Sequence, residues 1–327
     1  MEQPTTHGAS LIFVDGPTLE RVAEFPSLVE ALRQAHTRRM HCDESMHLSR
    51  TQPDGTRNAF NLLPAWQEDE VLGAKLVTYF PGNLDKGLPS AQGIFALFNA
   101  ATGTPSAIID GTALTLWKTS ADSALGSSLL SRPDSRCLLV VGAGGLSFHA
   151  VAAHLAVRPA LERVLIWNRS PTRATALRDR LLHTDLGQGR TIHVVSDLEK
   201  ATAEADIITC LTMSETPLIQ GAWVKNGTHV DLIGGWTPQM REVDGPLIAR
   251  ARVFGNERNR ILECGDLLAP LRAGDITAEH ILGDLFDLCT GLPGRNTTQD
   301  ITVYKNAGGG HLDLFTARYI LARMTLA

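Results

Sequence analysis

The sequence lacks three features that would each have pointed to a different class of protein. No apolar run approaches the ~18–20 residues that a membrane-spanning helix needs, so we expect no membrane partner. The 30 Lys and Arg residues are outnumbered by 35 Asp and Glu residues, which argues against binding to nucleic acid. The five cysteines are widely spaced and form no C-x-x-C pair, which argues against a disulfide framework and a zinc site.

Two further absences concern location and metal binding. The first residues carry neither the basic nor the apolar stretch of a secretory signal, so we expect a cytoplasmic protein. The histidines do not stand at metal-ligand spacing: His149 and His154 are five residues apart, and no H-E-x-x-H motif occurs. We therefore expect no metal.

The chain has 327 residues, of which 43% are apolar, and this is enough for two domains with sizeable cores. Up to about residue 117, the aliphatic runs 74–80, 93–98 and 106–110 are separated by close turns, which predicts an antiparallel sheet. From about residue 116, short buried strands alternate with helices, which predicts a Rossmann-type, doubly wound parallel sheet. The predicted fold class is α/β, with one domain of each kind.

The strongest local motif is a glycine loop between a predicted strand, 137–141, and an alanine-rich helix. Gly142 permits a tight strand-to-helix turn, and Gly144 lets the backbone approach a pyrophosphate group closely. Gly145 and Leu146 complete the loop, so we assign them to the cofactor as well. Ser147 replaces the third glycine of G-x-G-x-x-G and is still small enough for close helix packing. This context predicts binding of a nicotinamide dinucleotide.

The end of the next predicted strand indicates which dinucleotide. NAD-binding chains usually carry Asp or Glu there, about 20 residues beyond the glycines, to hold the ribose 2′-hydroxyl. This chain has Asn168, Arg169 and Ser170, with Arg173 a helical turn further on. Guanidinium and hydroxyl groups suit a 2′-phosphate, which favours NADP(H) as the cofactor. The alternatives are NAD(H) as the cofactor, and Arg169 as a solvated surface charge. Residues 209–214, at the end of the fourth strand, are expected to flank the same crevice, and we assign three of them to the cofactor: Leu211, Thr212 and Met213.

Several strings, taken together and in constant order from about residue 50 to the C-terminus, resemble the ornithine cyclodeaminase/μ-crystallin family. They are residues 75–78 with 81–83, 87–90 with 92–93, 110–115, 142–144 with His149, 167–169, 265–267 and 301–305. The chain looks closest to the imine and ketimine reductases of this family.

The resemblance implies a homodimer, in which the antiparallel domain joins its partner and the C-terminal helix packs back on that domain. It places a substrate-binding and dimerisation domain at residues 1–118 and 304–327, and a Rossmann domain at 119–303. The family holds its substrate carboxylate with basic residues from the first domain, and Arg50, Lys75 and Lys118 match those positions. Lys75 could also handle a proton.

The sequence departs from the family pattern at the substrate pocket. Lys118-Thr119 stands where an Arg-Thr string is usual; we assign Thr119 to the cofactor, whereas Lys118 supplies charge without a bidentate fork. Trp236 replaces the aspartate that cyclodeaminases need, and it would wall the pocket near the nicotinamide or pack on a loop. In a looser alignment, Asn61 replaces another acidic residue of cyclodeaminases. Asp231 is a weaker catalytic candidate that could instead cap a turn.

The favoured function is an NAD(P)H-dependent oxidoreductase that reduces a small imino acid to the L-amino acid. A cyclic ketimine such as Δ1-pyrroline-2-carboxylate is the favoured substrate, because reduction needs positioning and a proton but no strong base. The alternatives are an amino-acid dehydrogenase or opine-type imine reductase, an ornithine cyclodeaminase, and a non-catalytic NADPH-dependent ligand-binding protein of the μ-crystallin type. The missing aspartate disfavours the cyclodeaminase.

Overall fold

The computed structural model describes residues 11–38, 40, 44–67 and 70–326. The chain forms two compact units. Unit 1 contains residues 11–23, 40–118 and 309–326, and unit 2 contains residues 24–38 and 119–308. Within the described residues, no helix is both long and apolar enough to cross a membrane.

Unit 1 is built on a six-stranded sheet in the order β1-β6-β5-β4-β3-β2. All its neighbouring strands are antiparallel except β1 and β6, which are parallel. The sheet predicted to be antiparallel is therefore mixed, because the N-terminal strand β1 pairs with the edge strand β6 in the parallel direction. Its strands are β1 (Ile12–Val14), β2 (Met46–Thr51), β3 (Arg57–Gln67), β4 (Val71–Tyr79), β5 (Ala91–Asn99) and β6 (Pro105–Asp110). The helical elements are α1 (Gly16–Val22), η1 (Pro81–Lys86), α3 (Gly111–Leu130) as far as Lys118, and α11 (Gly310–Leu326).

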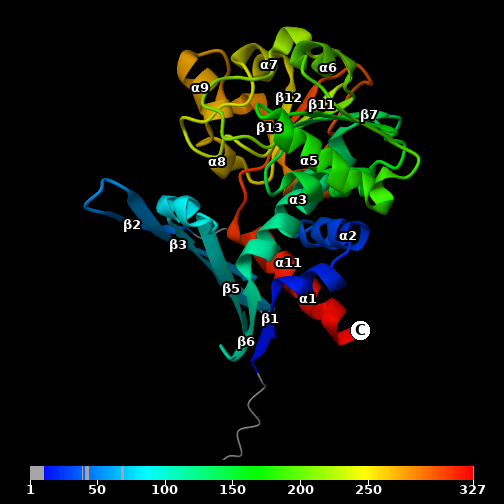
Figure 1. The fold of residues 1–327 in the computed structure, drawn as a ribbon. Coiled ribbons are helices and arrows are strands. Elements are labelled where there is room, and N and C mark those ends of the chain that lie inside the picture. Colours follow the sequence, from blue (N-terminus) through cyan, green and yellow to red (C-terminus); the bar gives the residue numbers. More distant parts are fainter. Residues whose placement is uncertain (1–10, 39, 41–43, 68–69, 327) are drawn as a thin grey trace, which may run out of the picture. The chain divides into compact units, whose positions relative to one another are not determined.

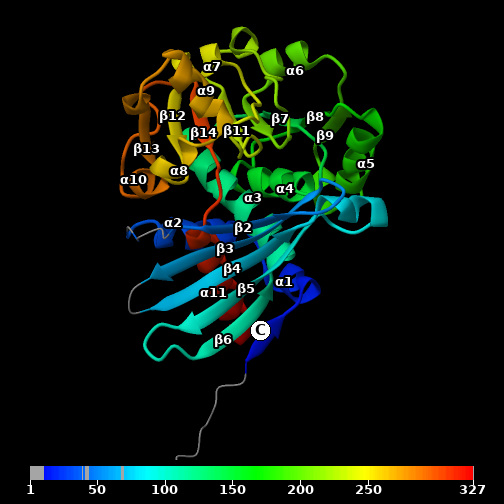
Figure 2. The same cartoon turned by 90° about the vertical axis from the view of Figure 1, so that its left-hand side faces the viewer.

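The two faces of this sheet have different surroundings. Helix α11 packs on β3, β4 and β5 (Figure 2). It can approach closely because it begins at Gly310, where a Cβ would stand 2.5 Å from the Pro64 carbonyl oxygen. Lys75 and its cross-strand neighbour Phe95 project to this covered face and are buried. On the other side, which we call the outer face, exposed apolar side chains gather: Met46, Leu48, Phe60 and Trp66.

Unit 2 is built on an eight-stranded parallel sheet in the order β13-β12-β14-β11-β10-β7-β8-β9. The Rossmann-type sheet predicted from the alternation of strands and helices is confirmed. Its strands are β7 (Cys137–Val141), β8 (Arg163–Trp167), β9 (Thr191–Val194), β10 (Ile207–Cys210), β11 (His229–Leu232), β12 (Arg252–Gly255), β13 (Ile281–Asp284) and β14 (Thr302–Lys305). Its helical elements besides the rest of α3 are α2 (Phe25–Ala35), α4 (Ser147–Val157), α5 (Pro171–Leu182), α6 (Leu198–Glu204), α7 (Gly245–Arg250), α8 (Arg258–Ile261), α9 (Gly265–Ala273), α10 (Leu285–Cys289), η2 (Asp185–Gly187), η3 (Gly221–Trp223) and η4 (Ala278–His280).

Both faces of the parallel sheet are apolar and covered, as β7 illustrates. Alternate residues of this strand belong to two different core clusters, with Leu138 and Val140 in one and Leu139 and Val141 in the other. Since successive side chains of a strand point to opposite faces, a run of five buried apolar residues requires cover on both sides. The chain order reverses between β7 and β10, and this switch point opens a crevice at the carboxyl ends of the strands.

The predicted domain boundaries need two corrections. Residues 24–38 belong to unit 2, because α2, the labelled blue helix in Figure 1, packs near α4 and buries an apolar face that includes Phe25 and Leu28. Residues 304–308 also belong to unit 2, because β14 pairs with β11 and β12 in the middle of the parallel sheet. The chain returns to unit 1 only at Gly309.

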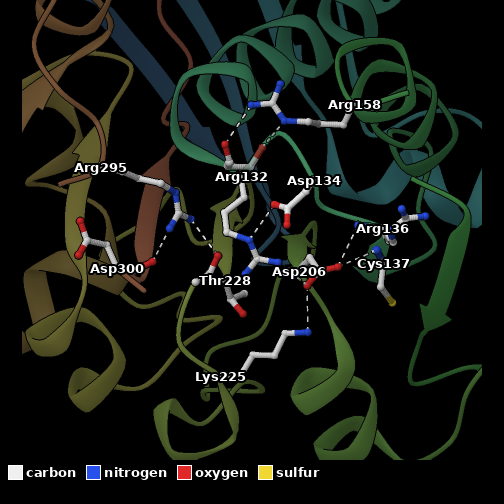
Figure 3. A network of polar contacts seen from close by, with 12 residues as sticks. Arg132, Asp134, Arg136, Cys137, Arg158, Asp206, Lys225, Thr228, Arg295 and Asp300 are labelled. Atoms are coloured by element: carbon white, nitrogen blue, oxygen red, sulfur yellow. Dashed lines mark hydrogen bonds and ion pairs between the residues drawn. The ribbon is translucent and has the colours of Figure 1, made fainter. Parts of the chain in front are cut away.

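A network of charged groups fixes the amino ends of the parallel strands (Figure 3). Asp206 precedes β10 and accepts hydrogen bonds from the backbone N–H groups of Arg136 (2.9 Å) and Cys137 (3.1 Å). It also pairs with Arg132 at 3.1 Å and Lys225 at 3.0 Å. Burial alone would raise the pKa of Asp206, but these donors hold it below its usual value. The ionised carboxylate thus ties β7 to β10 at the edge opposite the crevice.

Candidate functional site

A cavity of about 380 Å³ lies at the carboxyl ends of β7, β8 and β10 in unit 2. The lining residues that the sequence had singled out are Gly142, Gly144, Asn168, Arg169, Arg173, Leu211, Thr212 and Met213. Ser214, expected beside the cofactor with the rest of its strand end, also lines the cavity. Three more lining residues were not assigned to a cofactor from the sequence: Ala143, Trp167 and Leu218. Four that were assigned do not line this cavity: Thr119, Gly145, Leu146 and Ser170.

The glycine loop has the geometry that a phosphate group requires. Gly142 has φ of +116°, and a Cβ there would stand 2.8 Å from the carbonyl oxygen of Leu211, so only glycine fits. A Cβ on Gly144, by contrast, would have no heavy atom within 4 Å. The hydroxyl of Ser147 donates to the Gly142 carbonyl at 3.0 Å and fixes the turn into α4. Open space beside Gly144, at the start of an 11-residue helix, fits the pyrophosphate of a dinucleotide.

Asn168 and the two arginines beyond it have separate roles in this cavity. The Asn168 side chain accepts from the Ala143 N–H at 3.0 Å and donates to the Ser170 carbonyl at 3.0 Å, so it holds the glycine loop. Arg169 and Arg173 line the cavity and are exposed, and within the described part of the chain neither has a carboxylate partner. Both guanidinium groups are therefore available to an anionic ligand.

Unit 1 contains a second cluster of functional groups, centred on a buried carboxylate. Asp313 of α11 lies 3.5 Å from the Nζ atom of Lys75 on β4 and 3.2 Å from that of Lys118 on α3. The two lysine side chains are only 9% and 5% exposed, and Asp313 is fully buried. Lys75 also donates to the hydroxyl of Thr115. The family resemblance brought Lys75 and Lys118 forward together with Arg50, but Asp313 was missed because it stands as one acidic residue in a largely buried helix.

This cluster holds one more positive than negative charge. Burial lowers the pKa of Lys75, and the neighbouring Lys118 lowers it further, while Asp313 acts in the opposite direction. Two ammonium groups that share one carboxylate leave a buried positive charge that a second anion would compensate. The arrangement suits a small ligand with a carboxylate group.

Arg50, the third predicted carboxylate ligand, is placed differently within unit 1. It pairs with Asn58 on β3, whereas Lys75 pairs with Leu63 on the same strand. Positions 58 and 63 are an odd number of residues apart, so Arg50 and Lys75 point to opposite faces of the sheet. They are also separated by roughly 16 Å along β3, at about 3.3 Å per residue. The structure therefore does not bring Arg50 to the lysine pair within unit 1.

Three other predicted residues lie in unit 2. Trp236 is 59% exposed in the turn after β11 and does not pack as a core residue. Asp231 is fully buried in β11 and accepts hydrogen bonds from the hydroxyls of Ser123 (2.8 Å) and Thr209 (2.7 Å), so its contacts are those of a structural group. Thr119 is buried, and its carbonyl accepts from Asn306. Across the described ranges, no three His, Cys, Asp or Glu side chains are grouped to hold a metal ion.

The fold and the cavity define a dinucleotide-binding α/β protein with a second sheet unit that carries buried lysines. The model of the ornithine cyclodeaminase/mu-crystallin family matches residues 18–326, and the chain belongs to this family. It is 46% identical over 296 residues, 89% of this chain and 90% of the relative, to a Delta(1)-pyrroline-2-carboxylate reductase of Paracoccus denitrificans. It is 36% identical over 305 residues, 92% of this chain and 95% of the relative, to the reductase of that name from Colwellia psychrerythraea.

A solved structure has the same fold over almost the whole chain. It is the Delta(1)-pyrroline-2-carboxylate reductase of Thermococcus litoralis in complex with NADH and L-proline. The two chains superimpose with a TM-score of 0.86 at 25% sequence identity, over 97% of this chain and 98% of the other.

The open space at Gly144 gives the first testable prediction. In Gly144→Val the new Cβ would have no heavy atom within 4 Å, so we expect the free energy of unfolding to change by no more than about 0.5 kcal/mol. The valine would occupy the space of the pyrophosphate, and we expect the dissociation constant for NADPH or NADH to rise about tenfold or more. Thermal denaturation and cofactor fluorescence titration measure the two effects. Unchanged cofactor affinity in this variant would contradict the assignment of the loop.

Proposed function

We propose that the protein is an NAD(P)H-dependent oxidoreductase that reduces a small cyclic imino acid, Δ1-pyrroline-2-carboxylate, to the L-amino acid. The observation that carries this proposal is the 46% identity, over about nine tenths of both chains, to a reductase of that substrate. The glycine loop and the positively charged lysine cluster support it, because one fits a dinucleotide and the other an anionic substrate. Trp236 supports it against a cyclodeaminase, since an indole cannot take or give the proton of amine elimination.

Each group of residues has a separate task in this reaction. Reduction of the C=N bond forms one C–H and one N–H bond, and the nicotinamide supplies the hydride when the cofactor is bound. The loop at Gly142 and Gly144, with the start of α4, holds the pyrophosphate. Lys75 and Lys118 bind and orient the substrate carboxylate. Lys75 is also the proton donor to the imine nitrogen, because burial lowers its pKa and makes the ammonium group a stronger acid.

The activity and the role of Lys75 can be tested together. We expect NADPH absorbance to fall with Δ1-pyrroline-2-carboxylate, and Lys75→Met to lower kcat/KM about 100-fold or more. The variant should fold, because Lys118 and Asp313 remain as a balanced pair. Its affinity for NADPH, measured by fluorescence, should match that of the wild type.

Other outcomes of this assay identify the alternatives. Turnover of a 2-oxo acid that requires ammonia or an amine would indicate an amino-acid dehydrogenase or opine-type enzyme. Release of ammonia from ornithine without net cofactor consumption would indicate a cyclodeaminase. Tight binding of an imino acid without turnover would indicate a ligand-binding protein. Any of these three results, together with no reduction of Δ1-pyrroline-2-carboxylate, would contradict the proposal.

We further propose that NADP(H) is preferred over NAD(H). Arg169 and Arg173 support this preference, because both line the cavity and no residue of the 168–170 segment carries a carboxylate that would repel a 2′-phosphate. Asn168 hydrogen-bonds to the glycine loop and leaves the contact with the 2′ position to the guanidinium groups.

Arg169→Ala should therefore weaken NADPH binding about 10- to 100-fold while changing NADH binding less than about threefold. The matched control is Arg178→Ala on α5, since Arg178 pairs with Asp179 and does not line the cavity. Fluorescence titrations with the two cofactors give the ratio. An equal loss of affinity for NADPH and for NADH would show that Arg169 does not contact the 2′-phosphate.

We propose a homodimer formed through the outer face of unit 1. This face exposes four large apolar side chains on adjacent strands, Met46, Leu48, Phe60 and Trp66, at 39% to 55% exposure. Large apolar side chains exposed on one face of a sheet are typical of an interface. Each protomer would present the same face, as a two-fold dimer requires.

Light scattering after gel filtration should therefore give twice the chain mass of 35.3 kDa for the wild type. Phe60→Glu should shift the protein to the monomer, because the carboxylate would be buried in the interface. Leu182→Glu, at a residue of α5 that is 49% exposed, is the control and should stay dimeric. A Phe60→Glu variant that remains dimeric would exclude this face as the interface.

A further inference from the structure

Behind the cofactor cavity of unit 2, the segment around Glu242 holds the wall formed by Leu211, Thr212, Met213 and Ser214. The Arg241 N–H donates to the Ser214 carbonyl at 2.7 Å. The N–H groups of Leu218 and Ile219 donate to the Glu242 carbonyl at 2.9 and 3.0 Å. Backbone hydrogen bonds to residues 241 and 242 thus hold the end of the wall at Ser214 and the chain just beyond it at residues 218 and 219.

The side chain of Glu242 makes the most direct of these contacts. Its Oε1 atom accepts from the backbone N–H of Thr212 at 2.6 Å and from the Thr212 hydroxyl at 2.7 Å. Glu242 is fully buried, whereas Thr212 is partly exposed at the cavity. One carboxyl oxygen therefore fixes both the backbone and the side-chain rotamer of a residue that faces the cofactor.

Glu242 belongs to a buried cluster with two acidic groups and one basic group. Asp266 on α9 accepts from the Glu242 N–H at 2.7 Å and pairs with Lys305 of β14 at 3.2 Å. Lys305 also donates to the carbonyl of Gly234, in the turn that leads to Trp236. All three ionisable residues are fully buried. The Oε2 atom of Glu242 has no hydrogen-bond partner among the described residues.

The surroundings of Glu242 favour its neutral form. Burial and the negative charge of Asp266 raise the pKa of Glu242 to about 8, although Lys305 and the donors of Thr212 act against this rise. The Cys210 thiol of β10 faces the same group, and burial and the three carboxyls nearby raise its pKa well above the usual value, so it stays neutral. Since Lys305 is already paired with Asp266, the second carboxyl has no cation of its own.

We propose that Glu242 is a positioning residue for cofactor binding, which acts by holding Thr212, and with it the cavity wall at residues 211–214, in the conformation that receives the dinucleotide. This inference rests on the proposed function, since it takes the cavity as the NAD(P)H site. Glu242 itself does not line the cavity, so it acts through Thr212. The same cluster fixes the turn at Gly234, where a Cβ would collide with the Thr212 carbonyl and with the Glu242 carboxyl.

The test compares Glu242→Ala, which removes the acceptor, with Glu242→Gln, which keeps an oxygen at the same place. We expect Glu242→Ala to raise the dissociation constant for NADPH tenfold or more, and its KM likewise, with kcat at saturating cofactor changed less than threefold. Glu242→Gln should restore affinity to within threefold of the wild type. Thr212→Val, which keeps the carboxyl, should weaken binding by itself and add less than its full effect to Glu242→Ala.

The pH dependence of stability and a core variant add two further checks. A raised pKa in the folded state means that the stability from neutral Glu242 is complete below the ordinary carboxyl pKa of 4.5 and is lost progressively as the pH rises to about 8. The wild type should therefore lose melting temperature between pH 5 and pH 8 more steeply than Glu242→Gln, which has no titrating group at this position. Ile281→Ala on β13, at the far edge of the sheet, is the control that destabilises the core without touching the wall.

Two results would overturn the inference. One is a Glu242→Ala variant that binds NADPH as tightly as the wild type. The other is an Ile281→Ala variant that loses as much melting temperature as Glu242→Ala and also loses as much NADPH affinity. If the wild type binds neither NADPH nor NADH, the proposed function itself is contradicted. If the wild type binds the cofactor and Glu242→Ala binds it equally well, only the inference about Glu242 is contradicted.

Discussion

The buried carboxylate of Asp313 organises unit 1, because both Lys75 and Lys118 contact it. It joins three elements that are distant in the sequence, namely β4, α3 and α11. Two lysines can be buried only where a carboxylate offsets part of their desolvation, so the position of α11 decides whether the pair can exist at all. The close approach of that helix at Gly310 is therefore a condition for the chemistry as well as for packing.

Unit 2 depends on a different constraint, which is that parallel strands present all their carboxyl ends at one edge. At the other edge, the amino ends of β7 and β10 are fixed by the contacts of Asp206. At the carboxyl ends, the reversal of strand order between β7 and β10 separates the loops that follow them. Gly142 can pass beneath Leu211 only because it has no side chain. The shape of the cavity thus follows from topology and from one glycine.

The sequence was sufficient for the fold class, the parallel sheet and the glycine loop, because these follow from local patterns: strand–helix alternation and a G-x-G turn. It was insufficient wherever the answer depends on which element packs against which. Periodicity shows that α2 has an apolar face, but not that this face belongs to unit 2. The family resemblance brought Arg50 and Lys75 forward together, yet the register of β2 on β3 points them to opposite faces. Asp313 and Glu242 were invisible because a single acidic residue in a helix or loop has no pattern.

The two units contain buried clusters with opposite imbalances of charge. In unit 1, two ammonium groups share one carboxylate, and the excess positive charge is compensated when an anionic ligand binds. In unit 2, two carboxyls share the ammonium group of Lys305, and the excess is removed by a proton on Glu242. The difference follows from what each cluster must do. Under the proposed function, the lysine cluster keeps its charge until the anionic substrate binds, whereas the cluster proposed to hold the cavity wall is most stable when it is neutral.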